Sequence, residues 1–189
     1  YGIIVRPEVL DEDFVPDALI ARDKHIQELK FCLTPALRGR RPLNAWLYGR
    51  PGTGKTAVAK FVLEQLLEQT NVQGIYINCW RYRTLFAVLD KLVRDLRVMF
   101  ADKPDATVKV EGLRKVLENK PFIVVLDEID KPETKERNSI LYELLQIGKV
   151  GLICICNSRY FLLSSDERVQ SRLFPRQISF EPYTVDELV

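Results

Sequence analysis

The fold of this chain is decided by the stretch Gly49-Arg50-Pro51-Gly52-Thr53-Gly54-Lys55-Thr56. It fits the pattern G-x-x-x-x-G-K-[ST] of a phosphate-binding loop, in which glycines let successive backbone N–H groups turn inward around an anion. A helix that leaves the loop aims the positive end of its dipole at the same phosphates. Lys55 would reach the β- and γ-phosphates, and the hydroxyl of Thr56 would hold Mg²⁺. The stretch therefore predicts a site for a nucleoside triphosphate.

The residues on both sides of the loop favour this interpretation over a glycine-rich turn with an incidental lysine. Residues 43–48 form a short apolar run typical of a buried strand that enters the loop. Residues 57–69 have the pattern of a helix that leaves it, apolar on most of its circumference, as expected for a helix packed against a sheet. Strand, loop and helix are thus expected in the order that a phosphate site needs.

Length, charge and cysteine usage limit the classes of protein to consider. The 189 residues suffice for one α/β domain and hardly for two, and a net charge of +2 gives no electrostatic reason for wrapping nucleic acid. No apolar run approaches about 18 residues and residues 11–13 are acidic, so we expect no membrane span and no signal peptide. The cysteines fit no zinc spacing and predict buried thiols in a reducing cytosol. They are Cys32, Cys79, Cys154 and Cys156.

Strand-like and helical patterns alternate along the chain. The continuous apolar run 122–127 is typical of a central parallel strand that is buried on both faces. A capping box at Ser164 would open a short helix before the last strand. Strands are expected at 43–48, 73–79, 122–127, 151–156 and 176–180, and the other helices at about 21–35, 83–98, 107–119 and 138–147. The alternation predicts an α/β fold with a parallel sheet and right-handed crossovers.

Polar residues follow two of these strands at the edge where the phosphate loop is expected. Asp127 ends the strand 122–127, so its carboxylate can hold Mg²⁺ through water, and Glu128 can accept a proton from water that attacks the γ-phosphate. Asn157 follows the next strand and can hydrogen-bond both this water and a γ-phosphate oxygen. An asparagine is also common in turns, which is the alternative for Asn157.

Two arginines on the short helix before the last strand have two interpretations that the residues leave open. Arg168 and Arg172 are four residues apart and share one face of this helix. They could form ordinary ion pairs at the surface. Alternatively, one of them could reach the nucleotide of a neighbouring subunit as an arginine finger, which neutralises charge in the transition state.

With these residues placed, the chain resembles the AAA+ ATPases, and within them the archaeal and eukaryotic replication-initiator family of origin-recognition and cell-division-control proteins. The likeness covers almost the whole chain. Its more discriminating segments are Arg168-Val169-Gln170-Ser171-Arg172 and Phe180-Glu181-Pro182-Tyr183-Thr184. Further segments that match in order are 37–44, Tyr76-Ile77-Asn78-Cys79 and Leu126-Asp127-Glu128-Ile129-Asp130.

The resemblance implies a P-loop fold of the AAA+ type, with strand order 5-1-4-3-2 and helices on both faces of the sheet. Val15, Pro16 and Arg22 would lie beside the adenine of bound ATP or ADP. Asn157 would be the sensor-one residue, and Arg172 the finger that acts on a neighbouring subunit, with Arg168 in support. Residues 1–42 would form a lead-in and helix, residues 43–182 the ATPase domain, and residues 183–189 the start of a lid.

Two departures from the family pattern concern DNA. The initiator insertion, which contacts origin DNA, often carries a Gly-Leu-Ser type motif, and residues 99–113 lack this motif. The helical lid and the winged helix that is the family's main DNA reader would lie beyond Val189. Double-stranded DNA is therefore expected as a partner mainly through that missing domain, alongside neighbouring AAA+ subunits and a replicative helicase. No membrane partner is expected, and the location would be cytoplasmic, at the nucleoid in an archaeon.

The function that follows is slow ATP hydrolysis used as a switch for assembly in a replication initiator. One alternative is another AAA+ ATPase, such as a clamp or helicase loader, which shares the Ser-Arg finger. Another is a nucleotide-gated binding module without turnover. A kinase for a small molecule is disfavoured, because Glu128 would promote hydrolysis of ATP by water instead of phosphate transfer to a substrate.

Overall fold

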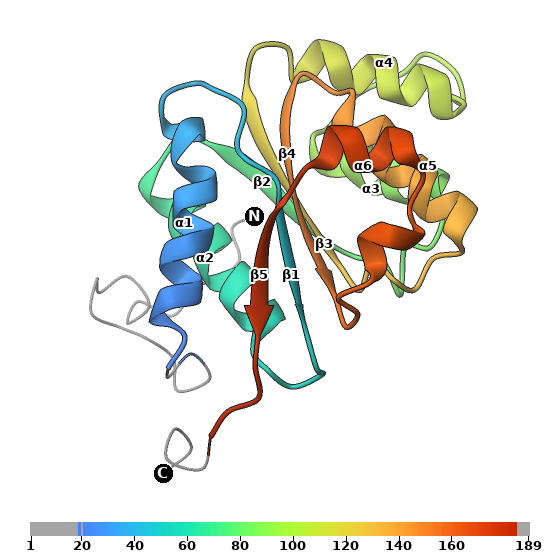
Figure 1. Cartoon of the computed structure of the whole chain (residues 1–189). Coiled ribbons are helices and arrows are strands. Elements are labelled where there is room, and N and C mark those ends of the chain that lie inside the picture. Colours follow the sequence, from blue (N-terminus) through green and yellow to red (C-terminus); the bar gives the residue numbers. More distant parts are fainter. Residues whose placement is uncertain (1–18, 20, 185–189) are drawn as a thin grey trace.

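The structure, a computed structural model, describes Leu19 and residues 21–184. A five-stranded parallel sheet forms its centre, with the strand order β2-β3-β4-β1-β5 (Figure 1). The strands are β1 (Ala45–Gly49), β2 (Gln73–Asn78), β3 (Pro121–Asp127), β4 (Lys149–Cys156) and β5 (Arg176–Phe180). The predicted α/β class, the parallel sheet and the order 5-1-4-3-2, which is the same order from the other edge, are confirmed.

Helices cover both faces of the sheet (Figure 1). One face carries α1 (Asp23–Leu37) and α2 (Lys55–Gln69), whose buried residues share a core with β1 and β5. The other face carries the other helices of the described residues. These are α3 (Leu85–Asp95), α4 (Ala106–Val116), α5 (Thr134–Leu145), the 3-10 helix η3 (Phe161–Ser164) and α6 (Glu167–Leu173).

The central strand β3 divides these two cores. Phe122, Val124 and Leu126 point into the core under α3 and α5, whereas Ile123 and Val125 point into the core under α1 and α2. This is the period-two alternation of a strand, with apolar residues on both faces. Because both sides are covered, the apolar run that the sequence shows at 122–127 is buried without interruption.

Several predicted helix boundaries were wrong: α3 and α4 each end three residues before the predicted positions 98 and 119. Helix α1 continues through Pro35 to Leu37, so the proline lies in its last turn instead of ending it. Helix α5 begins at Thr134, four residues early, because the polar residues of its first turn make tertiary contacts: Glu136 accepts a hydrogen bond from the backbone N–H of Leu85 at 2.8 Å. The carboxylate of Asp166 caps α6, since the Ser164 hydroxyl instead donates to the Phe161 carbonyl at 2.8 Å.

The start of the phosphate loop is fitted tightly against β5. A Cβ atom at Gly49 would lie 2.2 Å from the carbonyl oxygen of Phe180, closer than any side chain allows. Glycine is therefore required here by packing as well as by the loop. The four cysteines are free and buried, as predicted, and the Trp46 Nε1–H donates to the Cys156 sulfur at 2.9 Å.

Candidate functional site

The phosphate loop joins β1 to α2 at the carboxyl edge of the sheet. Gly52 and Gly54 have φ angles of 78° and 88°, which lie in the left-handed region that favours glycine. The Thr53 hydroxyl donates to the Arg50 carbonyl at 2.8 Å and stiffens the turn. Nothing lies within 4 Å of the position that a Cβ atom would take at Gly52, so the loop is open there.

Lys55 lies inside this loop. Its side chain is 6% exposed, and its Nζ donates to the carbonyls of Gly49 at 2.8 Å and Arg50 at 2.7 Å. Burial lowers the pKa of Lys55, and the negative charges of Asp127 and Asp130 oppose this shift. The loop thus holds its own cation at the place where phosphate oxygens would meet it.

Asp127 and Thr56 meet at the mouth of the loop, 71 residues apart in sequence. The Thr56 hydroxyl donates to Oδ2 of Asp127 at 2.8 Å, and the backbone N–H of Glu128 donates to Oδ1 at 2.9 Å. Asp127 is buried, with an exposed fraction of only 3%. The structure therefore brings together the two predicted metal-binding oxygens.

Tyr76 also belongs to this site and was missed by the sequence analysis. Its hydroxyl donates to Oδ2 of Asp127 at 2.6 Å, and the Lys60 Nζ lies 4.4 Å from the centre of its ring. Burial and the Asp127 carboxylate both raise the pKa of Tyr76, so it remains a donor. No sequence signal marks this contact, because it depends on the register of β2 against β3: Asn78 pairs with Asp127, and residues 76 and 78 of a strand point to the same face.

Glu128 and Asn157 follow β3 and β4 at the same sheet edge. Glu128 has a φ angle of 54°, rare for a residue other than glycine and often found at functional sites. The backbone N–H of Ile129 donates to the Ile155 carbonyl at 3.1 Å, which ties the Glu128 turn to the end of β4. Within residues 21–184, neither the Glu128 carboxylate nor the exposed Asn157 amide has a hydrogen-bond partner.

Arg22 precedes α1 and is buried, with 4% exposure. Its Nη2 donates to the Glu181 carbonyl at 2.8 Å, and its guanidinium lies 4.0 Å from the centre of the Tyr183 ring. Arg22 thus joins the start of α1 to the segment after β5. Val15 and Pro16, which were predicted with it beside the adenine, lie outside the described residues.

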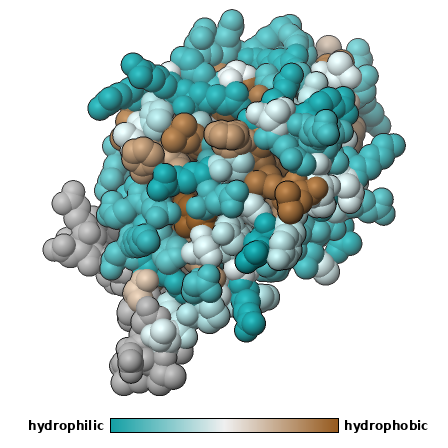
Figure 2. Space-filling model, in the orientation of Figure 1, coloured by the Kyte–Doolittle hydropathy of each residue, from teal (hydrophilic) through white to brown (hydrophobic). Residues whose placement is uncertain are grey.

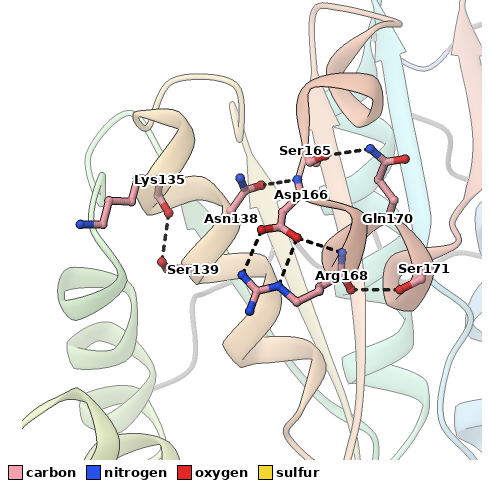
Figure 3. A network of polar contacts seen from close by, with 8 residues as sticks. All are labelled: Lys135, Asn138, Ser139, Ser165, Asp166, Arg168, Gln170 and Ser171. Carbon is pink, nitrogen blue, oxygen red and sulfur yellow. Dashed lines mark hydrogen bonds and ion pairs between the residues drawn. The ribbon is translucent and has the colours of Figure 1, made fainter.

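Arg168 and Arg172 differ in their contacts. Arg168 forms an ion pair with Asp166, with Nη2 at 3.0 Å and Nε at 3.2 Å from its oxygens (Figure 3). Arg172 is exposed, its guanidinium lies 5.0 Å from the centre of the Tyr142 ring, and it has no ion pair in the part of the chain that is described. The surface ion pair considered for both arginines is therefore found only for Arg168.

A network of hydrogen bonds holds the helix that carries both arginines (Figure 3). The Asn138 side chain of α5 accepts from the backbone N–H of Asp166 at 3.2 Å, and the Gln170 amide donates to the Ser165 carbonyl at 2.7 Å. The start of α6 is thereby fixed against α5.

The sheet order, the loop between β1 and α2, and the acidic pair after β3 define a P-loop domain of the AAA+ class. The family model described as an AAA ATPase domain matches residues 18–155. The chain belongs to this family of ATPases.

Similar proteins refine this assignment. The ORC1-type DNA replication protein 1 of Sulfurisphaera tokodaii is 39% identical over 192 residues, which cover 96% of this chain and 48% of that protein. The protein of the same name from Halobacterium salinarum is 34% identical, over 99% of this chain and 61% of that protein. The chain thus spans about half the length of these relatives, and the predicted resemblance to the replication-initiator family is confirmed.

Solved structures agree. The ORC1 protein of Aeropyrum pernix, solved in complex with DNA, has a TM-score of 0.78 and 36% identity, covering 95% of this chain and 50% of that one. Cdc6p of Pyrobaculum aerophilum has a TM-score of 0.80 and 26% identity, covering 98% and 52%. Separately, none of the helices in the described residues is long and apolar enough to cross a membrane.

Proposed function

We propose that this chain is the ATP-binding and ATP-hydrolysing core of a DNA replication initiator, in which ATP acts as a switch for assembly. The observation that carries the proposal is the hydrogen bond between Thr56 and Asp127 at the mouth of the phosphate loop, with a Glu128 carboxylate beside it that has no partner among the described residues. The names of the similar ORC1-type proteins support the biological context.

Binding of the triphosphate begins with the loop and Lys55. The backbone N–H groups of Arg50 and of residues 52–56, together with the start of α2, supply partial positive charge. Lys55 would exchange its two carbonyl partners for oxygens of the β- and γ-phosphates, to which a charged donor binds more strongly than to a neutral carbonyl.

The donor set at the mouth of the loop fits Mg²⁺. The Thr56 hydroxyl and the Asp127 carboxylate are oxygen ligands of the type that a small hard cation prefers, and Mg²⁺ commonly keeps water and phosphate as its other ligands. When bound, the ion would neutralise charge that develops between the β- and γ-phosphates. Thr56 would bind it directly, and Asp127 through water.

Replacement of Tyr76 by phenylalanine tests this arrangement. Tyr76→Phe removes the 2.6 Å hydrogen bond that orients Asp127, so we expect the Mg²⁺ concentration for half-maximal binding of a fluorescent ATP analogue to rise about tenfold. The hydroxyl of Tyr82 makes no hydrogen bond to the described residues, so Tyr82→Phe is the control and should leave the titration unchanged. Identical titrations for both variants would exclude a role for Tyr76.

Hydrolysis would use two side chains at this edge, Glu128 and Asn157, which have no hydrogen-bond partner in the described part of the chain. Glu128 would accept the proton of the attacking water, and Asn157 would hold that water and a γ-phosphate oxygen in line. The backbone on both sides of Glu128 is held by hydrogen bonds, from the Glu128 N–H to Asp127 Oδ1 and from the Ile129 N–H to the Ile155 carbonyl. These bonds would keep Glu128 in place.

Arg172 would complete the nucleotide site of a neighbouring subunit, because it is far from the phosphate loop of its own subunit. The Asn44 amide donates to the Leu173 carbonyl at 2.7 Å, so the end of α6 lies where β1 starts. The five residues of β1 span about 16 Å before the loop begins, so this length separates Arg172 from the phosphate loop of its own subunit.

The adenine would lie on the side of Arg22, with Val15 and Pro16 in the lead-in.

The partners proposed are neighbouring AAA+ subunits, double-stranded DNA and a replicative helicase. To test the function, ATP turnover by the intact protein is measured with and without double-stranded DNA, and assembly is followed by sedimentation. We expect slow turnover and assembly that depends on ATP and DNA. Turnover that responds only to a sliding clamp or helicase would favour a loader, and ATP binding without any turnover would favour a nucleotide-gated module.

A further inference from the structure

A groove of about 620 Å³ lies at the amino edge of the sheet, opposite the phosphate loop. It is formed where the segment before β1 meets the end of α6 and the start of β5. The residues that line it are Arg41, Pro42, Leu43, Asn44, Arg172, Leu173, Phe174, Pro175 and Arg176. Arg172 therefore faces this groove.

Phe174 is the one aromatic residue among the residues that line the groove. It is 89% exposed and has a φ angle of 29°, in a region that bulky side chains rarely adopt. The face shown in Figure 2, on which β5 and α6 lie in front, carries several hydrophobic patches in a mostly hydrophilic surface. Contact with water does not stabilise a phenylalanine side chain, so solvation does not explain why Phe174 is exposed in an unfavourable backbone conformation.

Asn44 explains how Phe174 is held outward. Its amide donates to the Leu173 carbonyl at 2.7 Å, and its own carbonyl accepts from the backbone N–H of Arg176 at 2.9 Å. The side chain of Leu173 is buried, with 1% exposure. The chain is thus fixed on both sides of Phe174, and its ring cannot turn into the core.

The groove is positively charged. Arg41, Arg172 and Arg176 line it and no carboxylate does; within the described residues none of the three has an ion pair. The Arg41 guanidinium donates to the carbonyls of Val150 and Leu145, and its pKa is lowered by burial and then by the charge of Arg172. A negatively charged partner would relieve this repulsion.

We propose that Phe174 is the apolar anchor that seats Arg172 on the nucleotide-bound edge of a second copy of this chain. That edge carries Asp127 and Glu128 and, when loaded, a triphosphate, which complements the arginines of the groove. Aromatic residues, including phenylalanine, and arginine are both enriched at protein–protein interfaces. Because groove and nucleotide lie at opposite edges of the sheet, two copies associate head to tail. This inference rests on the proposed role of Arg172.

Mixing two inactive variants of the intact protein tests the anchor. Glu128→Gln retains its finger but cannot hydrolyse ATP, and Arg172→Ala retains its own site but lacks the finger, so the mixture should recover turnover. Adding Phe174→Ala to the Glu128→Gln copy should lower the recovered turnover about tenfold at limiting protein concentration. Adding Phe174→Ala to the Arg172→Ala copy should not lower the recovered turnover, because that copy supplies only the edge that binds the nucleotide.

Two further variants control for shape and exposure. Phe174→Leu in the Glu128→Gln copy should keep most of the recovery, since it retains apolar area. Met99→Ala removes an apolar side chain of 92% exposure elsewhere and should have no effect. If the recovered turnover is equal with and without Phe174 in the Glu128→Gln copy, the role of Phe174 as an anchor is wrong, while the role of Arg172 is unaffected. If the parent mixture recovers nothing, the neighbour-directed role of Arg172 is wrong and the anchor falls with it.

Discussion

Replacing Lys55 by alanine is expected to abolish ATP binding. Its ammonium group is the cation inside the phosphate loop, and it is buried with two carbonyl partners. Its loss removes charge-assisted hydrogen bonds to the phosphates, so we expect the affinity for a fluorescent ATP analogue to fall at least about 100-fold. Equilibrium titration with this analogue measures the effect.

Loss of fold must be separated from loss of affinity. Lys55→Ala leaves the Gly49 and Arg50 carbonyls without their partner, which costs about 1–3 kcal/mol of stability. Lys55→Met keeps the apolar stem in place and should show the same loss of affinity with a smaller change in Tm. Lys24→Ala, on the exposed side of α1, is the matched control and should bind as the parent does. Parent-like affinity of Lys55→Met would contradict the assignment of the loop.

Replacing Glu128 by glutamine is expected to preserve ATP binding and stop turnover. The glutamine has the same shape, and the carboxylate makes no hydrogen bond within the described residues whose loss could disturb the fold. Loss of the general base should lower the rate of hydrolysis by about 100-fold or more. Phosphate release under saturating ATP measures the rate, and the fluorescent analogue measures the retained affinity.

A carboxylate nearby serves as control for the change of charge. Glu133 is exposed and its side chain caps nothing, although it precedes α5 directly. Glu133→Gln should therefore hydrolyse ATP at the parent rate. If Glu128→Gln also kept the parent rate, Glu128 would not be the base, and the interpretation as an ATPase switch would have to rest on another residue.

Most of the fold followed from local patterns of apolar residues along the chain. The continuous apolar run of β3 and the loop between β1 and α2 both lie where they were predicted. The boundaries that failed depend on contacts between distant residues. Helix α5 starts early because Glu136 binds the backbone of α3, and Asp166 caps α6 because Ser164 is used by η3.

The site shows the same division. The phosphate loop and the pair Asp127 and Glu128 could be found in the sequence, because spacing along the chain expresses their chemistry. Tyr76 could not be singled out, since a tyrosine in a strand is ordinary, and only the register between β2 and β3 brings its hydroxyl to Asp127. Phe174 likewise looks like any apolar residue until Asn44 is seen to hold the chain on both sides of it.

The sequence alone thus determined that a triphosphate loop follows the first strand and that acidic residues end the third, because glycine spacing and strand periodicity are local properties. The residues themselves left two interpretations open for Arg168 and Arg172, and only the resemblance to the replication-initiator family singled out Arg172. The tertiary structure added a difference in contacts, since Asp166 binds Arg168 and Arg172 faces the groove. It also separated that groove from the phosphate loop by the length of β1, because a parallel sheet keeps the two ends of its strands at opposite edges.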